Sequence, residues 1–156
     1  MAAELFLYDR FLDDRLSNAE LDWDDAAAGA FMWILATKDY VPNANHALSS
    51  DLSNVIAAGD GAPINVTSRD IDNTTIAGDT WLNSDAANFG TPVTIIAKYL
   101  ICVVPVVAGT YDPAASKLAF YVDLNTASGT AEIEVTGTEF RVDPPANGWM
   151  NFKKSV

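Results

Sequence analysis

Residues 93–107 form the most hydrophobic segment of this 156-residue chain, and this segment limits the possible folds more than any other. It is shorter than the run of about 20 apolar residues that spans a bilayer, and Lys98 and Pro105 interrupt it. A short apolar run of this kind is typical of a buried strand. We therefore predict a central strand, or a bent pair of strands, over 93–104, with Pro105 at a strand end, bulge or edge.

The other candidate strands are also short, and turn residues separate them. Residues 31–36 are continuously apolar and aromatic, which predicts a strand buried on both faces. Alternation over 63–70 and 130–140 predicts half-exposed strands, alternation over 117–124 predicts a further strand, and 148–152 has the length of a last short strand. About six to eight such strands predict a mainly β fold, either an antiparallel β-sandwich or a jelly-roll-like, partly open barrel.

The N-terminal segment has a different periodicity. Between residues 4 and 18 the apolar side chains recur at helical spacing, which predicts a short N-terminal helix in an arm of about residues 1–20. The whole chain, 1–156, is predicted to be a single β-rich domain that includes this arm. The helix would either pack on the β core or grip a neighbouring subunit. In the second case the candidate partner contacts are Leu5, Tyr8, Phe11 and Leu12.

The charge of the chain is strongly acidic. Lys and Arg number 9 against 21 Asp and Glu, so the formal net charge is −12. Sixteen of the acids are Asp, a residue that favours caps and turns over helix interiors. Nucleic-acid binding depends on clustered basic residues, so this composition argues against it. It favours high solubility or docking on a basic partner surface.

The residues that usually carry catalysis are scarce. His46 is the single histidine and Cys102 the single cysteine, and Cys102 lies in an apolar run that predicts a buried thiol. No metalloprotease, P-loop or nucleophile-elbow motif is present, and a two-carboxylate glycosidase site usually needs a longer cleft than a domain this small builds. Asp70-x-Asp72 alternates like a calcium loop but lacks its glycine and distal glutamate. We expect no catalytic site, no cofactor and no metal.

Targeting signals are also missing from the sequence. The first residues lack the basic start, the apolar stretch and the cleavage site of a secretory leader. With one cysteine the chain forms no internal disulfide, so its stability is expected to come from packing or assembly. These features predict a soluble protein that is made in a cytoplasm and does not enter a membrane.

The order of segments resembles a widespread group of small tailed-bacteriophage proteins. These proteins begin with a short helix. It is followed by an acidic segment, a buried strand and a Pro-Asn turn that ends in histidine. A mid-chain acidic element, two strands, an alternating strand and a closing Gly-aromatic segment come next. The matching segments here lie at 21–24 with 31–36, 40–46 with 50–52, 81–89, 117–123, 131–135 and 148–152. The chain departs from the pattern in lacking the lysine of the first strand and the Gly-Tyr near 59–64.

This resemblance implies a non-enzymatic virion structural protein. The leading hypothesis is a capsid decoration or cement protein that bridges major capsid subunits on the exterior of the phage head, after synthesis in the bacterial host cytoplasm. One alternative is a tail, neck or fibre-attachment component. Another is a host-glycan or receptor binding module with a stacking platform of Trp23, Trp81 or Trp149.

The implied partners are the major capsid protein and copies of the chain itself. We expect a homo-oligomer, with a trimer favoured, because four Trp, five Tyr and seven Phe exceed what one small core readily hides. We also expect the adhesive surface to consist of strand edges and loops rather than a pocket. The polar turns at 39–45 and 70–78 supply the further candidate contacts Asp39, Tyr40, Asn43, Asp70 and Asp72.

Overall fold

The fold is mainly β, as the sequence predicts. The computed structural model describes residues 4–8, 23, 29–72, 79–126, 131–146 and 148–153, and within these residues all strand pairs are antiparallel. The sheets do not close into a barrel in this part of the chain. The elements are β1 (Glu4–Leu7), β2 (Met32–Ala36), η1 (Ser49–Asp51), β3 (Val55–Ile56), η2 (Gly59–Gly61), β4 (Ile64–Asn65), β5 (Asp70–Asp72), β6 (Asp79–Asn83), β7 (Ala87–Asn88), β8 (Val93–Ala97), β9 (Tyr99–Val104), β10 (Lys117–Asp123), β11 (Ile133–Thr138), β12 (Arg141–Val142) and β13 (Met150–Lys153).

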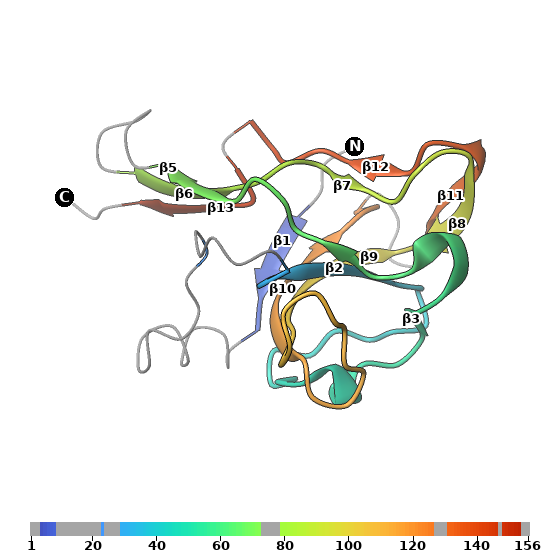
Figure 1. The fold of residues 1–156 in the computed structure, drawn as a ribbon, viewed down its shortest axis with the longest axis horizontal. Coiled ribbons are helices and arrows are strands. Elements are labelled where there is room, and N and C mark those ends of the chain that lie inside the picture. The colour runs from blue at the N-terminus through green and yellow to red at the C-terminus, as the bar shows by residue number, and fades with distance from the viewer. Residues whose placement is uncertain are drawn as a thin grey trace.

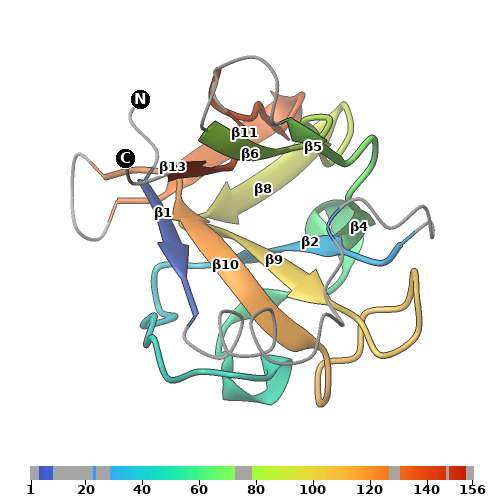
Figure 2. The same cartoon turned by 90° about the vertical axis from the view of Figure 1, so that its left-hand side faces the viewer.

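A main sheet runs in the order β1-β10-β9-β2-β3, and β4 also pairs with β2 (Figures 1 and 2). Side chains of β2 alternate between its two faces: Trp33 and Leu35 belong to one hydrophobic core, while Met32, Ile34 and Ala36 belong to the other. All five are buried. The prediction that residues 31–36 form a strand buried on both faces is therefore confirmed, because a strand covered on both sides needs no polar alternation.

A long ribbon of two strands forms a second layer over one face of the main sheet (Figure 1). Along the chain β6, β7 and β8 follow one another, and they pair in turn with β13, β12 and β11. β5 adds to the outer side of β6. Ribbon residues such as Leu82, Phe89, Ile95 and Trp149 share the larger core with Trp33 of the main sheet.

The two layers are joined at Lys98, which separates β8 from β9 by a single residue. The Lys98 backbone N–H donates to the carbonyl of Ala36 at 2.9 Å, and its carbonyl accepts from the N–H of Leu124 at 2.9 Å. The chain thus leaves the ribbon and enters the main sheet at one pinned corner. The predicted bent pair of strands over 93–104 is confirmed, and β9 ends at Val104, directly before Pro105.

The smaller core lies on the opposite face of the main sheet and is rich in tyrosine. The Tyr8 and Tyr40 hydroxyls are 2.8 Å apart, and the Tyr40 hydroxyl lies 3.0 Å from Nδ1 of His46. Tyr99 meets Tyr40 edge to face, with ring centroids 5.7 Å apart. Loop residues around Leu52 and Tyr111 cover this core.

The N-terminal helix prediction is wrong for the residues that the structure describes. Residues Glu4–Leu7 form β1, which pairs with β10 in the register Phe6↔Tyr121. The rings of Phe6 and Tyr121 stack with centroids 4.9 Å apart, and Tyr8 is buried. The free edge of β10 supplies hydrogen bonds and aromatic contacts that an isolated helix lacks, so tertiary contacts override the helical spacing. The remainder of the predicted arm, 9–20, lies outside the described residues.

The half-exposed strand predicted over 63–70 is also wrong beyond its first residues. Only Ile64 and Asn65 form strand β4. Ser68 has a φ of 50°, and the Asp85 carboxylate accepts hydrogen bonds from the hydroxyls of Ser68 at 2.6 Å and Thr67 at 3.1 Å. A side-chain acceptor thus holds this segment in a turn, and the alternation in the sequence does not report it.

Alkaline pH is expected to destabilise the protein through the tyrosine core. Burial raises the pKa of Tyr40 to about 12, and burial together with the Tyr40 hydrogen bond raises the pKa of Tyr8 further. In the unfolded chain both phenols ionise near pH 10. Their contribution to stability is thus complete below about pH 10 and falls as the pH rises toward about 12.

Urea unfolding between pH 8 and pH 12 measures this loss. In a variant with Tyr8→Phe and Tyr40→Phe the decline above about pH 10 should be shallower, with the remainder due to other groups. A decline of equal steepness in the variant would show that these two phenols do not cause it.

Candidate partner-binding groove

An open, mostly apolar groove of about 380 Å³ lies where the ribbon overhangs the end of β10. Its two walls are β11 with β12 on one side and Leu124 on the other. Ile133 and Val135 are half-buried and pack against the larger core, so the floor of the groove is continuous with that core. The lining residues are Leu124, Ile133, Val135, Glu139, Phe140, Arg141, Val142 and Asp143.

The ribbon bends beside this groove at Phe140. The Phe140 carbonyl accepts from the N–H of Phe89 at 3.0 Å, and its own N–H donates to the carbonyl of Gly90 at 3.2 Å. The two phenylalanine rings meet edge to face at 5.7 Å. The register also shifts between Thr136 and Thr138, where Gly137 adopts a φ of 69° that favours glycine. This bulge and the bend turn the apolar side of the ribbon toward Leu124.

Charged residues form the rim of the groove. The Arg141 guanidinium pairs with the Asp143 carboxylate at 2.7 Å, and both side chains are largely exposed. The Glu139 carboxylate accepts a hydrogen bond from the Asn88 amide at 2.8 Å. With two carboxylates against one guanidinium the rim is acidic, like the chain as a whole.

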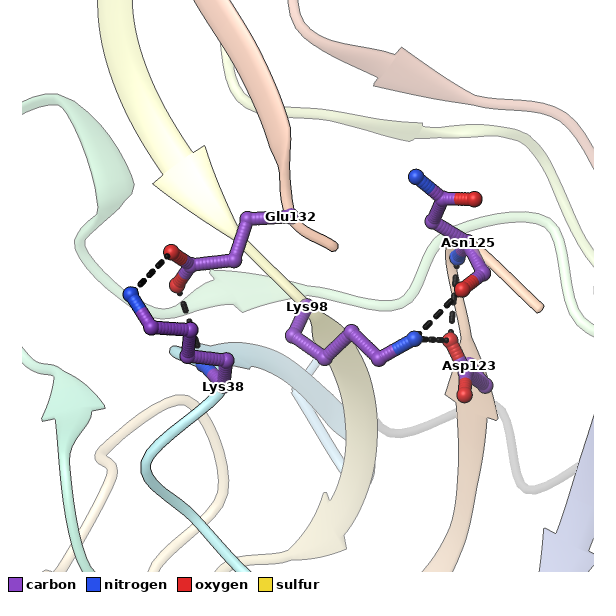
Figure 3. Close-up of polar contacts among 5 residues, drawn as sticks. All are labelled: Lys38, Lys98, Asp123, Asn125 and Glu132. Atoms are coloured by element: carbon purple, nitrogen blue, oxygen red, sulfur yellow. Dashed lines mark hydrogen bonds and ion pairs between the residues drawn. The ribbon is translucent and has the colours of Figure 1, made fainter. Parts of the chain in front are cut away.

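A buried ion pair fixes the Leu124 wall. The Lys98 side chain is fully buried, and its ammonium lies 2.6 Å from the Asp123 carboxylate, directly before Leu124 (Figure 3). The ammonium also donates to the backbone carbonyl of Asn125. The same Asp123 oxygen accepts from the N–H of Asn125 at 2.9 Å, so Asp123 bonds both to the Lys98 ammonium and to the backbone that follows β10.

A second ion pair fixes the opposite wall. Glu132 directly precedes Ile133, and its carboxylate accepts both from the Lys38 backbone N–H at 2.9 Å and from the Lys38 ammonium at 3.1 Å (Figure 3). These bonds hold the pKa of Glu132 below its usual value, the backbone bond most strongly, and the Glu132 hydrogen bond raises the pKa of Lys38. Each of the two walls is therefore connected to the rest of the fold by an ion pair.

This arrangement is suited to binding apolar side chains. Its volume lies at the lower end of the range of about 300–1,000 Å³ found for pockets that hold small ligands. The lining combines aliphatic and aromatic side chains with the charged side chains of Glu139, Arg141 and Asp143. Chemically it can desolvate apolar groups and attract a positive charge at its edge.

The residues that the sequence proposed as partner contacts do not form one surface. Asp39 and Asn43 are exposed on the loop after β2, and Asp70 is exposed on β5. The backbones of Leu5 and Asp72 lie in β1 and β5. Tyr8 and Tyr40 are brought together, but inside the smaller core. Phe11 and Leu12 lie outside the described residues.

The single histidine and cysteine serve packing in this fold. His46 bonds to Tyr40 through Nδ1 and is half-buried. Cys102 is fully buried in β9, as the sequence predicts, and burial raises the pKa of its thiol. Across the part of the chain that the structure describes, no three His, Cys, Asp or Glu residues gather as metal ligands.

All four tryptophans are buried: Trp23, Trp33, Trp81 and Trp149. An exposed stacking platform built from Trp23, Trp81 or Trp149 is therefore not present. The same burial weakens the aromatic argument for an oligomer, because these side chains are covered within one chain.

The groove itself was missed by sequence analysis. Its signal was present in the alternating strand at 130–140, where Ile133 and Val135 mark an apolar face, but the sequence does not reveal that this face is only half covered. That exposure depends on where Leu124 and Phe140 lie relative to Ile133, and the three residues meet at the groove only through the bends of the folded chain. The spacing of apolar residues carries no such information.

Within the described residues, no helix is long and apolar enough to cross a membrane. Comparison with models of protein families, with curated proteins and with solved structures finds no match for this chain.

Proposed function

We propose that this chain is a non-enzymatic structural protein of a tailed-bacteriophage virion and acts as a decoration or cement protein on the exterior of the head. It binds the major capsid protein and bridges neighbouring subunits. It also associates with copies of itself, with a trimer favoured, which light scattering of the purified chain tests. The resemblance in segment order supports the phage assignment.

The observation that carries the binding role is the apolar groove beside β11. It places half-exposed Ile133 and Val135 next to a charged rim, on a framework whose walls are pinned by Lys98 and Glu132. A rigid surface of this kind loses little conformational entropy when a protein partner covers it. Exposed valines on the loops, Val41 and Val106 among them, add further apolar contact area.

The net charge supports a basic protein partner. At −12 the chain is repelled by packaged nucleic acid and attracted by basic patches on a capsid. The exposed carboxylates of Asp39 and Asp70 are available for such contacts.

Binding to particles should therefore weaken with salt. Raising the ionic strength from about 0.1 M to about 1 M shortens the Debye length from about 10 Å to about 3 Å. We expect the dissociation constant for heads that lack the protein to rise about tenfold, which corresponds to about 1.4 kcal/mol. Asp39→Asn with Asp70→Asn should reduce this salt dependence, and sedimentation of labelled protein with heads measures both effects.

Copy number on the virion tests the position in the particle. Decoration predicts a number comparable with that of the major capsid protein, measured by quantitative mass spectrometry of purified particles. A small fixed number, with binding to isolated tails and none to heads, would overturn the decoration role in favour of a tail or neck component. Binding to heads that is indifferent to salt and to the two substitutions would overturn the electrostatic part alone.

A further inference from the structure

We propose that the groove beside β11 binds an extended peptide segment of a protein partner, which adds as a strand to the free edge of β11 and inserts alternate apolar side chains into the groove. This inference deepens the proposed function by stating how a partner is held, and it rests on that function only for the identity of the partner.

The first support is the edge of β11. One side of this strand pairs with β8, and among the residues that the structure describes no strand pairs with its other side. A free edge presents backbone N–H and C=O groups that another extended segment can pair with. The bulge at Gly137 interrupts the regular edge, so the stretch available for pairing is 133–136.

The second support is the direction of the side chains on β11. Ile133 lies opposite Ala97 and Val135 lies opposite Ile95, and both of these partners are buried in the core. Glu134 and Thr136, by contrast, are exposed on the other face. Side chains of an added strand alternate in the same way. Every second side chain would therefore point into the groove beside Ile133 and Val135, above Leu124.

The third support is the acidic rim, which selects the chemistry of the segment. The groove lining contains two carboxylates, Glu139 and Asp143, and one guanidinium, Arg141. Arg141 already forms an ion pair with Asp143. Glu134 adds a carboxylate to the exposed face of β11. A lysine or arginine beside the apolar positions of the segment is attracted here, whereas an acidic neighbour is repelled. The preferred ligand thus alternates apolar residues and carries basic ones.

The test uses the full chain and a library of random short peptides displayed on phage. Selected peptides should carry apolar residues at alternate positions together with lysine or arginine. Val135→Asp places a charge in the groove and should weaken their binding at least about tenfold. Thr136→Asp adds the same charge on the opposite, exposed face of the same strand, beside Glu134, and should bind the basic peptides at least as tightly as the original chain. Amide shifts on binding should concentrate on 133–136.

A third variant keeps the test valid if Val135→Asp fails to fold. Asp143→Lys changes only an exposed rim residue, and it should remove the preference for basic peptides while alternation persists. The inference is overturned if no peptide is enriched, if Val135→Asp and Thr136→Asp bind alike, or if a small apolar dye fills the groove and no peptide does. Peptide binding without head binding would instead overturn the capsid role alone, and head binding unaffected by Val135→Asp would overturn the groove alone.

Discussion

Replacing Asp123 with alanine is expected to lower the free energy of unfolding by about 3–5 kcal/mol, because it leaves the fully buried Lys98 ammonium without its carboxylate. For a domain whose whole stability is about 5–15 kcal/mol, this is a large fraction. The substitution removes a contact at the corner between β8 and β9, where Lys98 lies, and next to Leu124, which directly follows Asp123. Urea unfolding followed by tryptophan fluorescence measures the loss.

The exposed ion pair between Lys38 and Glu132 provides the matched control. Lys38→Gln removes an ammonium whose side chain is 47% exposed, and the backbone N–H of Lys38 still donates to Glu132. We expect a much smaller loss than for Asp123→Ala, because solvent screens an exposed pair. The double variant Lys98→Met with Asp123→Ala should be more stable than Asp123→Ala alone, because it also removes the buried ammonium. Equal losses for Asp123→Ala and Lys38→Gln would contradict the buried pair.

Tyr8→Ala is the second substitution with a large expected effect. Tyr8 is fully buried against Tyr121, and its hydroxyl bonds to that of Tyr40. Truncating a buried aromatic side chain typically costs about 3–5 kcal/mol. Tyr8→Phe removes only the hydroxyl and should cost about 1 kcal/mol. Thermal unfolding of the purified variants gives both values.

Phe6→Ala is the control for this position, because Phe6 lies in β1, two residues before Tyr8, and is 40% exposed. Its stacking on Tyr121 should contribute about 0.5–1.5 kcal/mol beyond burial. We expect the loss of stability to decrease in the order Tyr8→Ala, Phe6→Ala, Tyr8→Phe. This order tests whether the segment 4–8 belongs to the core. A Tyr8→Ala variant as stable as the original chain would return the N-terminal segment to the role of a detachable arm.

The sequence alone determined the central strands of this protein. The continuous apolar run over 31–36 and the segment 93–104 became β2 and the bent pair β8 and β9, and the alternation over 117–124 became β10. These predictions succeed because the pleat of a strand points successive side chains to opposite faces. Burial of one face then selects apolar residues at every second position, and burial of both faces selects a continuous apolar run. Cys102 was assigned to the core for the same reason.

Only the tertiary structure decided the role of the N-terminus. Leu5, Tyr8 and Leu12 share a helical spacing, yet Phe6 and Tyr8 also fit a strand with a period of two. The local preference of such a short segment for helix or strand is small. Strand formation depended on the edge of β10, more than a hundred residues away in the chain. The sequence of residues 4–18 gives no information about that edge.

The tertiary structure likewise decided the candidate binding surface. Asp39, Asn43 and Asp70 are polar and exposed as the sequence suggests, but they lie on separate elements, and Tyr40 is buried. The groove lies between Leu124 and residues of the segment 133–143, next to the ion pairs of Lys98 and Glu132. The composition and periodicity of a segment indicate which of its side chains are buried. Whether a groove remains between segments depends on how they pack against one another, and that is decided only in the tertiary structure.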